Sequence, residues 1–196
     1  MTAAPEIGIC LLAGGEATRL PGKLNLAAGD VPLLARVYRN VATGRPTVVS
    51  VREPLDAFTA GFISAQCVVD RWPQRGPLSG LLSAMSELRS PWVFAAAGDA
   101  PFLDAALIDA LAAQIGDDVD AVVPVHGERA RMEPLAALYR REAFLREGLP
   151  VLLAGDAGVR TVIGRLRTRE FPCADERQFT NINTAADFAA VREAFA

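Results

Sequence analysis

A single lysine in a glycine-rich segment is the first candidate for chemistry. Of the 20 lysine and arginine residues, Lys23 is the only lysine. Lysine is a compact point charge and arginine a planar fork, so a lone lysine suits a phosphate whose charge changes during a reaction. Gly14-Gly15, earlier in the segment, lets the backbone approach a ligand closely. Exposed backbone amides and Arg19 would add to the positive field.

This segment differs from two common phosphate-binding motifs. A Walker P-loop ends in Gly-Lys-Ser/Thr, whereas Leu24 follows Lys23 here. The Gly-x-Gly-x-x-Gly pattern of dinucleotide-binding folds is also absent. Considered alone, Lys23 is therefore either a phosphate ligand or a solvated residue in an ordinary turn between a strand and a helix.

A carboxylate, Asp99, is the second candidate, because it follows the very apolar residues 92–97. A carboxylate at the end of a buried strand, opposite a phosphate-binding loop, is a usual ligand of Mg²⁺. The alternative is an Asp that only opens a turn, since the Gly-Asp and Ala-Pro pairs around it are turn-prone.

Further polar groups follow other apolar segments. Glycines at both ends of residues 76–80 would let backbone groups approach a flat ring, and Asp70 could bind the edge of a base. The alternative for residues 76–80 is a plain loop that enters a helix. Asn181 and Asn183 alternate, so from an extended segment both point the same way, toward a ligand or toward their own backbone.

Two more polar residues lie beside apolar segments. Glu133 precedes an apolar segment and places a charge at the start of a strand. His126 is the only histidine, and no nucleophile elbow accompanies it. We expect His126 to lie on the surface at the end of a strand.

The elements that must position these residues follow from apolar spacing. Strands are predicted at residues 7–12, 47–51, 67–69, 92–97, 121–125, 135–139 and 170–171. Helices are predicted at residues 32–41, 80–88 and 104–115, at 141–166 with interruptions at Gly148, Pro150, Gly155 and Gly158, and after Thr184, which forms a capping box with Asp187. Alternating strands and helices indicate a mostly parallel sheet, which binds ligands at the carboxyl ends of its strands.

Bulk properties narrow the class of protein. A length of 196 residues fits one α/β domain, and net charge −3 without a basic run argues against a nucleic-acid surface. Three dispersed cysteines indicate reduced thiols in a cytoplasmic protein, with Cys10 and Cys67 expected in the core. No signal peptide is evident, and no apolar run approaches the ~20 residues that span a bilayer.

Taken together, the segments resemble the MobA-like nucleotidyltransferases, and most closely the molybdenum cofactor guanylyltransferases. The resemblance covers nearly the whole chain in five motifs: Leu12-Ala13-Gly14-Gly15-x-x-x-Arg19 with Lys23, Gly76-Pro77-Leu78-Ser79-Gly80, Gly98-Asp99-Ala100-Pro101-Phe102, Glu133-Pro134-Leu135-Ala136-Ala137-Leu138-Tyr139 and Phe179-Thr180-Asn181-Ile182-Asn183-Thr184. It implies one MobA-like domain over residues 1–196, with a Rossmann-like three-layer α/β fold and a mostly parallel central sheet.

The resemblance also implies an activity. GTP and Mg²⁺ would bind, and the terminal phosphate of molybdopterin would attack the α-phosphate of GTP. Pyrophosphate would leave, and molybdopterin guanine dinucleotide would form. A protein that supplies molybdopterin is a further expected partner, whereas nucleic acid and membrane are not expected.

Roles for single residues follow from the same resemblance. Lys23, Arg19 and Asp99 would be catalytic, with Asp99 as the Mg²⁺ ligand. The nucleotide would contact Leu12, Ala13, Gly14, Gly15, Lys23, Asp70, Gly76, Pro77, Leu78, Gly80 and Asp99. Glu133, Asn181 and Asn183 would lie on the acceptor side.

The chain departs from the family pattern at three places. The spacing from Arg19 to Lys23 is shorter than usual, with Gly22 where an Asp is common. Gly98 stands where a Cys is common, and Ser50-Val51-Arg52 replaces an Asn after the second strand. The alternatives are a relative that uses CTP or another phosphorylated acceptor, and a nucleotide-binding protein without catalysis.

Overall fold

The structure is a computed structural model that describes residues 5–14, 19–72 and 76–195. Its strands are β1 (Ile7–Leu12), β2 (Ala27–Ala28), β3 (Val31–Pro32), β4 (Thr47–Val51), β5 (Gln66–Val69), β6 (Trp92–Ala97), β7 (Ala121–His126), β8 (Arg131–Met132), β9 (Ala136–Arg140) and β10 (Thr168–Pro172). Its helices are α1 (Leu33–Ala42), α2 (Ala57–Ala60), α3 (Gly76–Glu87), α4 (Ala105–Ala112), α5 (Arg141–Leu153), α6 (Val159–Ile163) and α7 (Ala185–Ala194), with the 3₁₀ helices η1 (Lys23–Asn25) and η2 (Glu176–Phe179).

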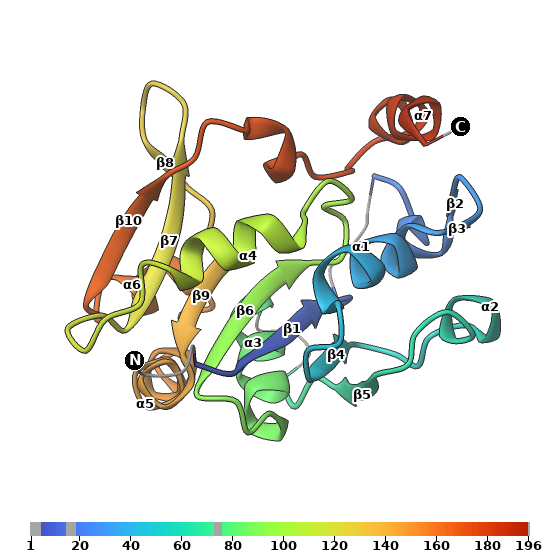
Figure 1. The fold of residues 1–196 in the computed structure, drawn as a ribbon. Coiled ribbons are helices and arrows are strands. Elements are labelled where there is room, and N and C mark those ends of the chain that lie inside the picture. Colours follow the sequence, from blue (N-terminus) through green and yellow to red (C-terminus); the bar gives the residue numbers. More distant parts are fainter. Residues whose placement is uncertain (1–4, 15–18, 73–75, 196) are drawn as a thin grey trace.

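One central sheet runs through the molecule in the order β10-β7-β9-β6-β1-β4-β5, with β8 added beside β7 (Figure 1). Strands β4, β1 and β6 are parallel neighbours, as are β4 with β5 and β7 with β10. Strand β9 is antiparallel to both β6 and β7, and β8 is antiparallel to β7. The mostly parallel α/β architecture predicted from the sequence is therefore confirmed.

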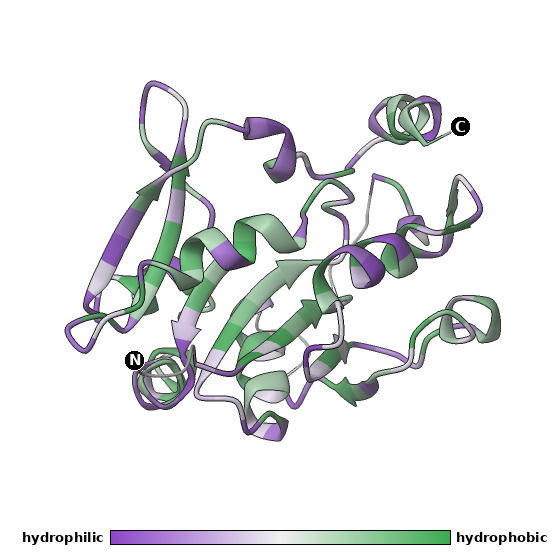
Figure 2. Cartoon of the chain, in the orientation of Figure 1, coloured by the Kyte–Doolittle hydropathy of each residue, from purple (hydrophilic) through white to green (hydrophobic). Residues whose placement is uncertain are grey.

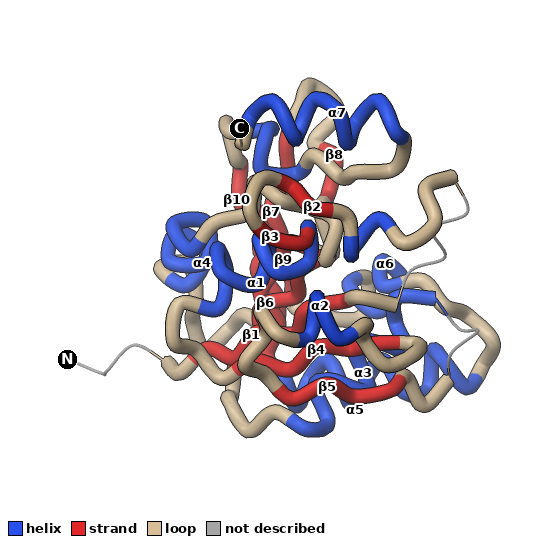
Figure 3. The backbone as a smooth tube through the Cα atoms, turned by 90° about the vertical axis from the view of Figure 1, so that its right-hand side faces the viewer, coloured by secondary structure: helices blue, strands red, loops and turns tan. Residues whose placement is uncertain are grey.

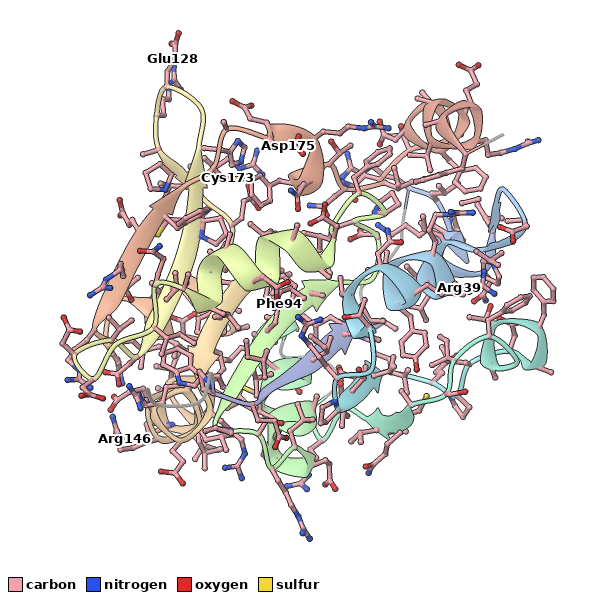
Figure 4. The ribbon with its side chains drawn as sticks, in the orientation of Figure 1. Arg39, Phe94, Glu128, Arg146, Cys173 and Asp175 are labelled. Atoms are coloured by element: carbon pink, nitrogen blue, oxygen red, sulfur yellow. The ribbon has the colours of Figure 1, made fainter. Side chains whose placement is uncertain are left out.

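Helices cover both faces of the sheet, so the fold has three layers (Figures 1 and 3). Helices α1 and α4 pack on one face, and α3, α5 and α6 pack on the other. Strand β6 serves both layers, because Phe94 faces α1 and α4 while its neighbours Val93 and Ala95 face α3 and α5. Figure 2 accordingly shows β1 and β6 as apolar along their length, and Figure 4 shows Phe94 in the interior while Glu128 and Arg146 point outward.

Two helices differ from the prediction, and both differences have a packing reason. Helix α3 begins at Gly76, so residues 76–80 are its first turn rather than a loop; Pro77 fits there because the first turn needs no donor from it. Helix α5 continues through Gly148 and Pro150. A Cβ at Gly148 would lie 3.0 Å from Leu82 Cδ2, so this glycine allows the close approach of α5 to α3.

Two predictions about single residues were wrong. Cys67 is exposed rather than buried, because β5 is an edge strand of the sheet, whereas Cys10 is fully buried as predicted. The side chain of His126 is only 11% exposed rather than on the surface. Its ring stacks on Phe179, with centroids 4.8 Å apart, and its Nε2 lies 2.8 Å from Glu133 Oε1. Among the described residues, no helix is long and apolar enough to cross a membrane.

Candidate active site

The carboxyl ends of four parallel strands meet at one edge of the sheet. Leu12 at the end of β1 is level with Ser50 on β4 and with Ala97 on β6, and Val51 is level with Val69 on β5. The chain crosses from β1 to β4 on one side and returns to β6 on the other, so this edge holds a topological switch point, where α/β sheets bind ligands. A cleft of about 640 Å³ lies there, a size typical of ligand sites.

Most of the residues implied by the family resemblance line this cleft. They are Leu12, Ala13, Gly14, Lys23, Asp70, Gly76, Pro77, Gly80, Asp99 and Asn183. Gly15 falls outside the described residues. Leu78 is fully buried in the core beneath the cleft rather than in its lining.

The Lys23 end of the cleft, formed by Lys23, Asp99, Ile182 and Asn183, is built around the only lysine. The ammonium donates to the Asp99 carboxylate, to the Ile182 carbonyl oxygen at 2.6 Å and to Asn183 Oδ1 at 3.2 Å. Lys23 is 8% exposed, so a buried ammonium is matched by three acceptors, as burial of a charge requires. The solvated-lysine alternative is thereby excluded.

Local backbone geometry delivers Lys23 to this position despite the short spacing from Arg19. Gly22 has φ +67°, a left-handed conformation that suits glycine, and η1 begins directly after it. A second glycine, Gly98, allows Asp99 to approach β1. A Cβ at Gly98 would lie 2.6 Å from the Leu12 carbonyl oxygen, which accepts a hydrogen bond from the Gly98 amide at 2.9 Å.

The C-terminal segment completes the Lys23 end. The Ile182 amide donates to the Asp99 carbonyl oxygen at 2.9 Å, which holds this segment beside β6. Thr184 and Asp187 form the predicted capping box at the start of α7. Backbone hydrogen bonds from Asn183 and Thr184 lower the pKa of Asp187 below its ordinary value, and the charge of Arg19 contributes least.

The Asp70 end of the cleft is formed by Gly14, Ser50, Arg52, Asp70 and Gly80. The Ser50 hydroxyl donates to Asp70 Oδ1. Burial raises the pKa of Asp70 above its ordinary value, while the Ser50 hydrogen bond and the Arg52 charge oppose that rise. A Cβ at Gly80 would lie 2.6 Å from Ser50 Oγ, so glycine is needed where α3 passes this pair.

Besides Leu78, three residues implied by the resemblance lie outside the lining. Arg19 is exposed, and Asn181 is half-buried, but neither borders the cleft. Glu133 does not border it either, because its carboxylate is turned to His126 and to Arg131 Nε at 3.1 Å. The neighbouring Leu135 lines the cleft instead, since antiparallel β9 starts at the edge where β6 ends.

Several lining residues were not predicted from the sequence. Ser50 and Arg52 had a signal, since Ser50 lies near the end of the predicted strand at residues 47–51 and Arg52 directly follows it. Asn25 and residues 53–56 also line the cleft. They had no signal, because a tertiary contact, the hydrogen bond from Thr59 Oγ1 to Asn25 Oδ1 at 3.0 Å, joins the segment after β4 to Asn25 in η1.

The side chains that could ligate a metal ion show whether a divalent cation fits this cleft. No group of three or more His, Cys, Asp or Glu side chains among the described residues could hold a metal by itself. Asp99 offers one carboxylate, 20% exposed, at the cleft. Mg²⁺ is commonly bound by one or two carboxylates together with substrate phosphates. The residues therefore fit a cation that arrives with a phosphorylated substrate.

Comparisons with known proteins agree with this geometry. The sequence matches the MobA-like NTP transferase domain over residues 9–170. It is 34% identical to a molybdenum cofactor guanylyltransferase of Burkholderia orbicola (strain MC0-3), covering 96% of this chain and 97% of that protein. It is 35% identical to a protein of the same name from Burkholderia ambifaria (strain MC40-6), covering 96% of each.

A solved structure shares the fold. The molybdopterin-guanine dinucleotide biosynthesis protein A of Archaeoglobus fulgidus superposes with a TM-score of 0.78, at 23% identity, covering 95% of this chain and 97% of that one. The family match spans most of the sequence, and the motifs that carried the resemblance converge on one cleft. The chain therefore belongs to the MobA-like NTP transferase domain family.

Proposed function

We propose that this chain is a molybdenum cofactor guanylyltransferase, which transfers GMP from GTP to molybdopterin and releases pyrophosphate. The product would be molybdopterin guanine dinucleotide. Relatives of this name match over nearly their whole length, which supports the assignment. The observation that carries it is the Lys23 ammonium beside the Asp99 carboxylate, inside a cleft at the ends of β1 and β6.

Nucleotidyl transfer requires little covalent participation by protein side chains. The attacking phosphate oxygen and the leaving pyrophosphate must be in line, and the negative charge that shifts to the leaving group must be compensated. The cleft meets these needs with charge and backbone rather than with a nucleophile. Its only lysine supplies positive charge at the Lys23 end, and Gly14 presents backbone without a side chain to the cleft.

Each end of the cleft takes a part of GTP in this proposal. The triphosphate binds at the Lys23 end, where the ammonium leaves its resting acceptors and donates to phosphate oxygens. The base and ribose bind at the Asp70 end, along the start of α3, where Gly76 and Gly80 let them approach the backbone. Molybdopterin approaches past Asn183, which lines the cleft beside Lys23 and whose side-chain amide can donate to its phosphate.

Asp99 holds Mg²⁺ together with the phosphates of the bound nucleotide in this proposal. When bound, Mg²⁺ neutralises charge on the phosphates. Without nucleotide, the Lys23 ammonium neutralises the Asp99 carboxylate. With a nucleotide bound, Lys23 would donate to phosphate oxygens, and the Asp99 carboxylate would be the residue that holds the cation.

Pyrophosphate release tests the proposal. The chain is incubated with molybdopterin, Mg²⁺ and, in separate reactions, GTP, CTP, ATP or UTP. We expect release with GTP only, and only when molybdopterin is present. Release with CTP would assign the chain to a relative with another nucleotide. Tight GTP binding without release would identify a nucleotide-binding protein without catalysis, and either result contradicts the proposal.

A further inference from the structure

One cation at the Asp70 end is not used by the mechanism above. Arg52 directly follows β4, is half-buried and lines the cleft. Its side chain lies against Gly14, because a Cβ at Gly14 would lie 3.1 Å from Arg52 Cγ and 3.0 Å from Asp70 Oδ2. Arg52 and Asp70 therefore flank Gly14, and the positive charge of one acts on the carboxylate of the other.

Arg52 and Asp70 lie side by side and have opposite hydrogen-bonding roles. A guanidinium only donates, in a planar fork, and an ionised carboxylate only accepts. Ser50 contributes a hydroxyl that is already directed at Asp70 Oδ1, which fixes the carboxylate. A ligand that meets both groups must offer an edge with two acceptors and an edge with donors.

Guanine is the base with these two edges. Its O6 and N7 are adjacent acceptors that match the fork of an arginine, and its N1–H and N2 amino group are donors that match a carboxylate. Adenine places an amino group where guanine has O6, and cytosine also turns an amino donor toward the fork. A donor opposite Arg52 would leave buried polar groups unpaired, and such mismatches discriminate strongly between ligands.

Of the two cations in the described lining of the cleft, Arg52 is the one placed to contact the base. Lys23, the other cation at the described lining, belongs to the opposite end and donates to Asp99, Ile182 and Asn183. Its charge is therefore placed for phosphates. Arg52 shares the Asp70 end with Gly80 of α3, which lines the cleft and packs against Ser50 and Asp70.

We propose that Arg52 determines the choice of base, donating from its guanidinium to O6 and N7 of guanine while Asp70 accepts from the opposite edge. This assignment rests on the proposed function, because it specifies which purine edge the site recognises. It also gives the Ser50-Val51-Arg52 segment, where the chain departs from its family, a function of its own.

An analogue that lacks one acceptor tests the assignment. In 7-deaza-GTP a C–H replaces N7, so one of the two hydrogen bonds to the fork cannot form. Dissociation constants of GTP and 7-deaza-GTP are measured by titration calorimetry with the full chain and Mg²⁺, without acceptor. We expect the wild type to bind 7-deaza-GTP about tenfold more weakly. Arg52→Met should bind GTP about tenfold more weakly than the wild type and should bind the two nucleotides equally.

Control variants separate this role from a structural one. Arg52→Lys keeps the charge but loses the fork, so it should also fail to distinguish the two nucleotides. Arg146→Met removes an arginine on α5, far from the cleft, and should discriminate as the wild type does (Figure 4). Melting curves of all variants confirm that each is folded.

The outcomes distinguish this assignment from the proposed function. A wild type that binds GTP but does not distinguish it from 7-deaza-GTP contradicts the role of Arg52 alone, as does an Arg52→Met variant that still distinguishes them. A wild type that does not bind GTP contradicts the proposed function and this assignment together.

Discussion

The two ends of the cleft hold charge in different ways. At the Lys23 end an ammonium is surrounded by acceptors from β6 and from the segment before α7, up to 160 residues away in sequence. At the Asp70 end a carboxylate is held by Ser50 on the neighbouring strand, only 20 residues away. One end is assembled by the whole fold, and the other by adjacent strands.

The Lys23 end is suited to chemistry, and the Asp70 end is suited to recognition of a ligand. The Lys23 end keeps two opposite charges in contact and can separate them when a charged substrate arrives. The Asp70 end keeps a carboxylate whose pKa is raised mainly by burial, so it retains an unfavourable charge that a ligand with donors would relieve.

Removal of the ammonium should have the largest effect on catalysis. Lys23→Ala should lower turnover by at least ~10²-fold, the scale for loss of one electrostatic stabiliser. Lys23→Arg should restore little, because a planar fork replaces a compact charge in a nearly closed space. Turnover is measured by pyrophosphate release with saturating GTP and acceptor. Near-normal turnover of Lys23→Ala would contradict the role of the Lys23 end.

Gly98 and Gly80, one near each end of the cleft, should differ in how well they tolerate substitution by alanine. In Gly98→Ala the new Cβ meets the Leu12 carbonyl oxygen at 2.6 Å, and the backbone must shift. In Gly80→Ala it meets Ser50 Oγ and Leu12 Cδ2, and side chains can rotate away. We expect about 3 kcal/mol of destabilisation for Gly98→Ala and about 1 kcal/mol for Gly80→Ala, within the usual range for overpacking.

Urea unfolding curves measure both glycine variants. Gly80→Ala should also weaken GTP binding, because rotation of Ser50 would break its hydrogen bond to Asp70. Equal stability of the two variants would contradict a tight contact between Gly98 and the Leu12 carbonyl oxygen.

The paired asparagines offer a matched test of the acceptor side. Asn183 lines the cleft and accepts from Lys23, whereas Asn181 does not border the cleft. Loss of one hydrogen bond to a charged group should raise the KM for molybdopterin about tenfold in Asn183→Ala. Asn181→Ala should change it less than twofold. Steady-state kinetics with varied acceptor decide, and a larger effect at Asn181 would reverse the assignment.

The smallest effect concerns stability at the Asp70 end. The folded-state pKa of Asp70 is raised above the ordinary value of about 3.9, so its charged form costs stability above that pH. Asp70→Asn removes this cost and keeps an acceptor for Ser50. The variant should melt about 2–4 °C higher at pH 7, corresponding to about 1 kcal/mol.

The pH dependence supplies the check on Asp70. The advantage of Asp70→Asn should shrink as the pH falls through the raised pKa and vanish below about 3.9, where the wild-type carboxyl is protonated in both states. GTP binding should weaken in the same variant. A lower melting temperature at pH 7 would mean that the Arg52 charge outweighs the cost of burial.

Local patterns in the sequence were enough for most elements. Strands β1, β4 and β6 have the predicted bounds, because runs of apolar residues bounded by turn residues are local signals. The start of α3 and the continuity of α5 were not predicted. Gly76, Gly148 and Pro150 resemble helix breakers in sequence, and at Gly148 the close packing of α5 on α3 favours the residue without a side chain.

The sequence by itself determined the class of fold, the loops that carry polar groups and the family, because strand periodicity and motif order are written along the chain. Tertiary structure decided which of those groups meet. It brought Lys23 to Asp99 and Ile182, turned Glu133 toward His126 and placed Arg52 beside Asp70. The reason is physical: contacts between distant segments depend on strand order, on register and on the return of the C-terminal segment to β6, and none of these is encoded in local spacing.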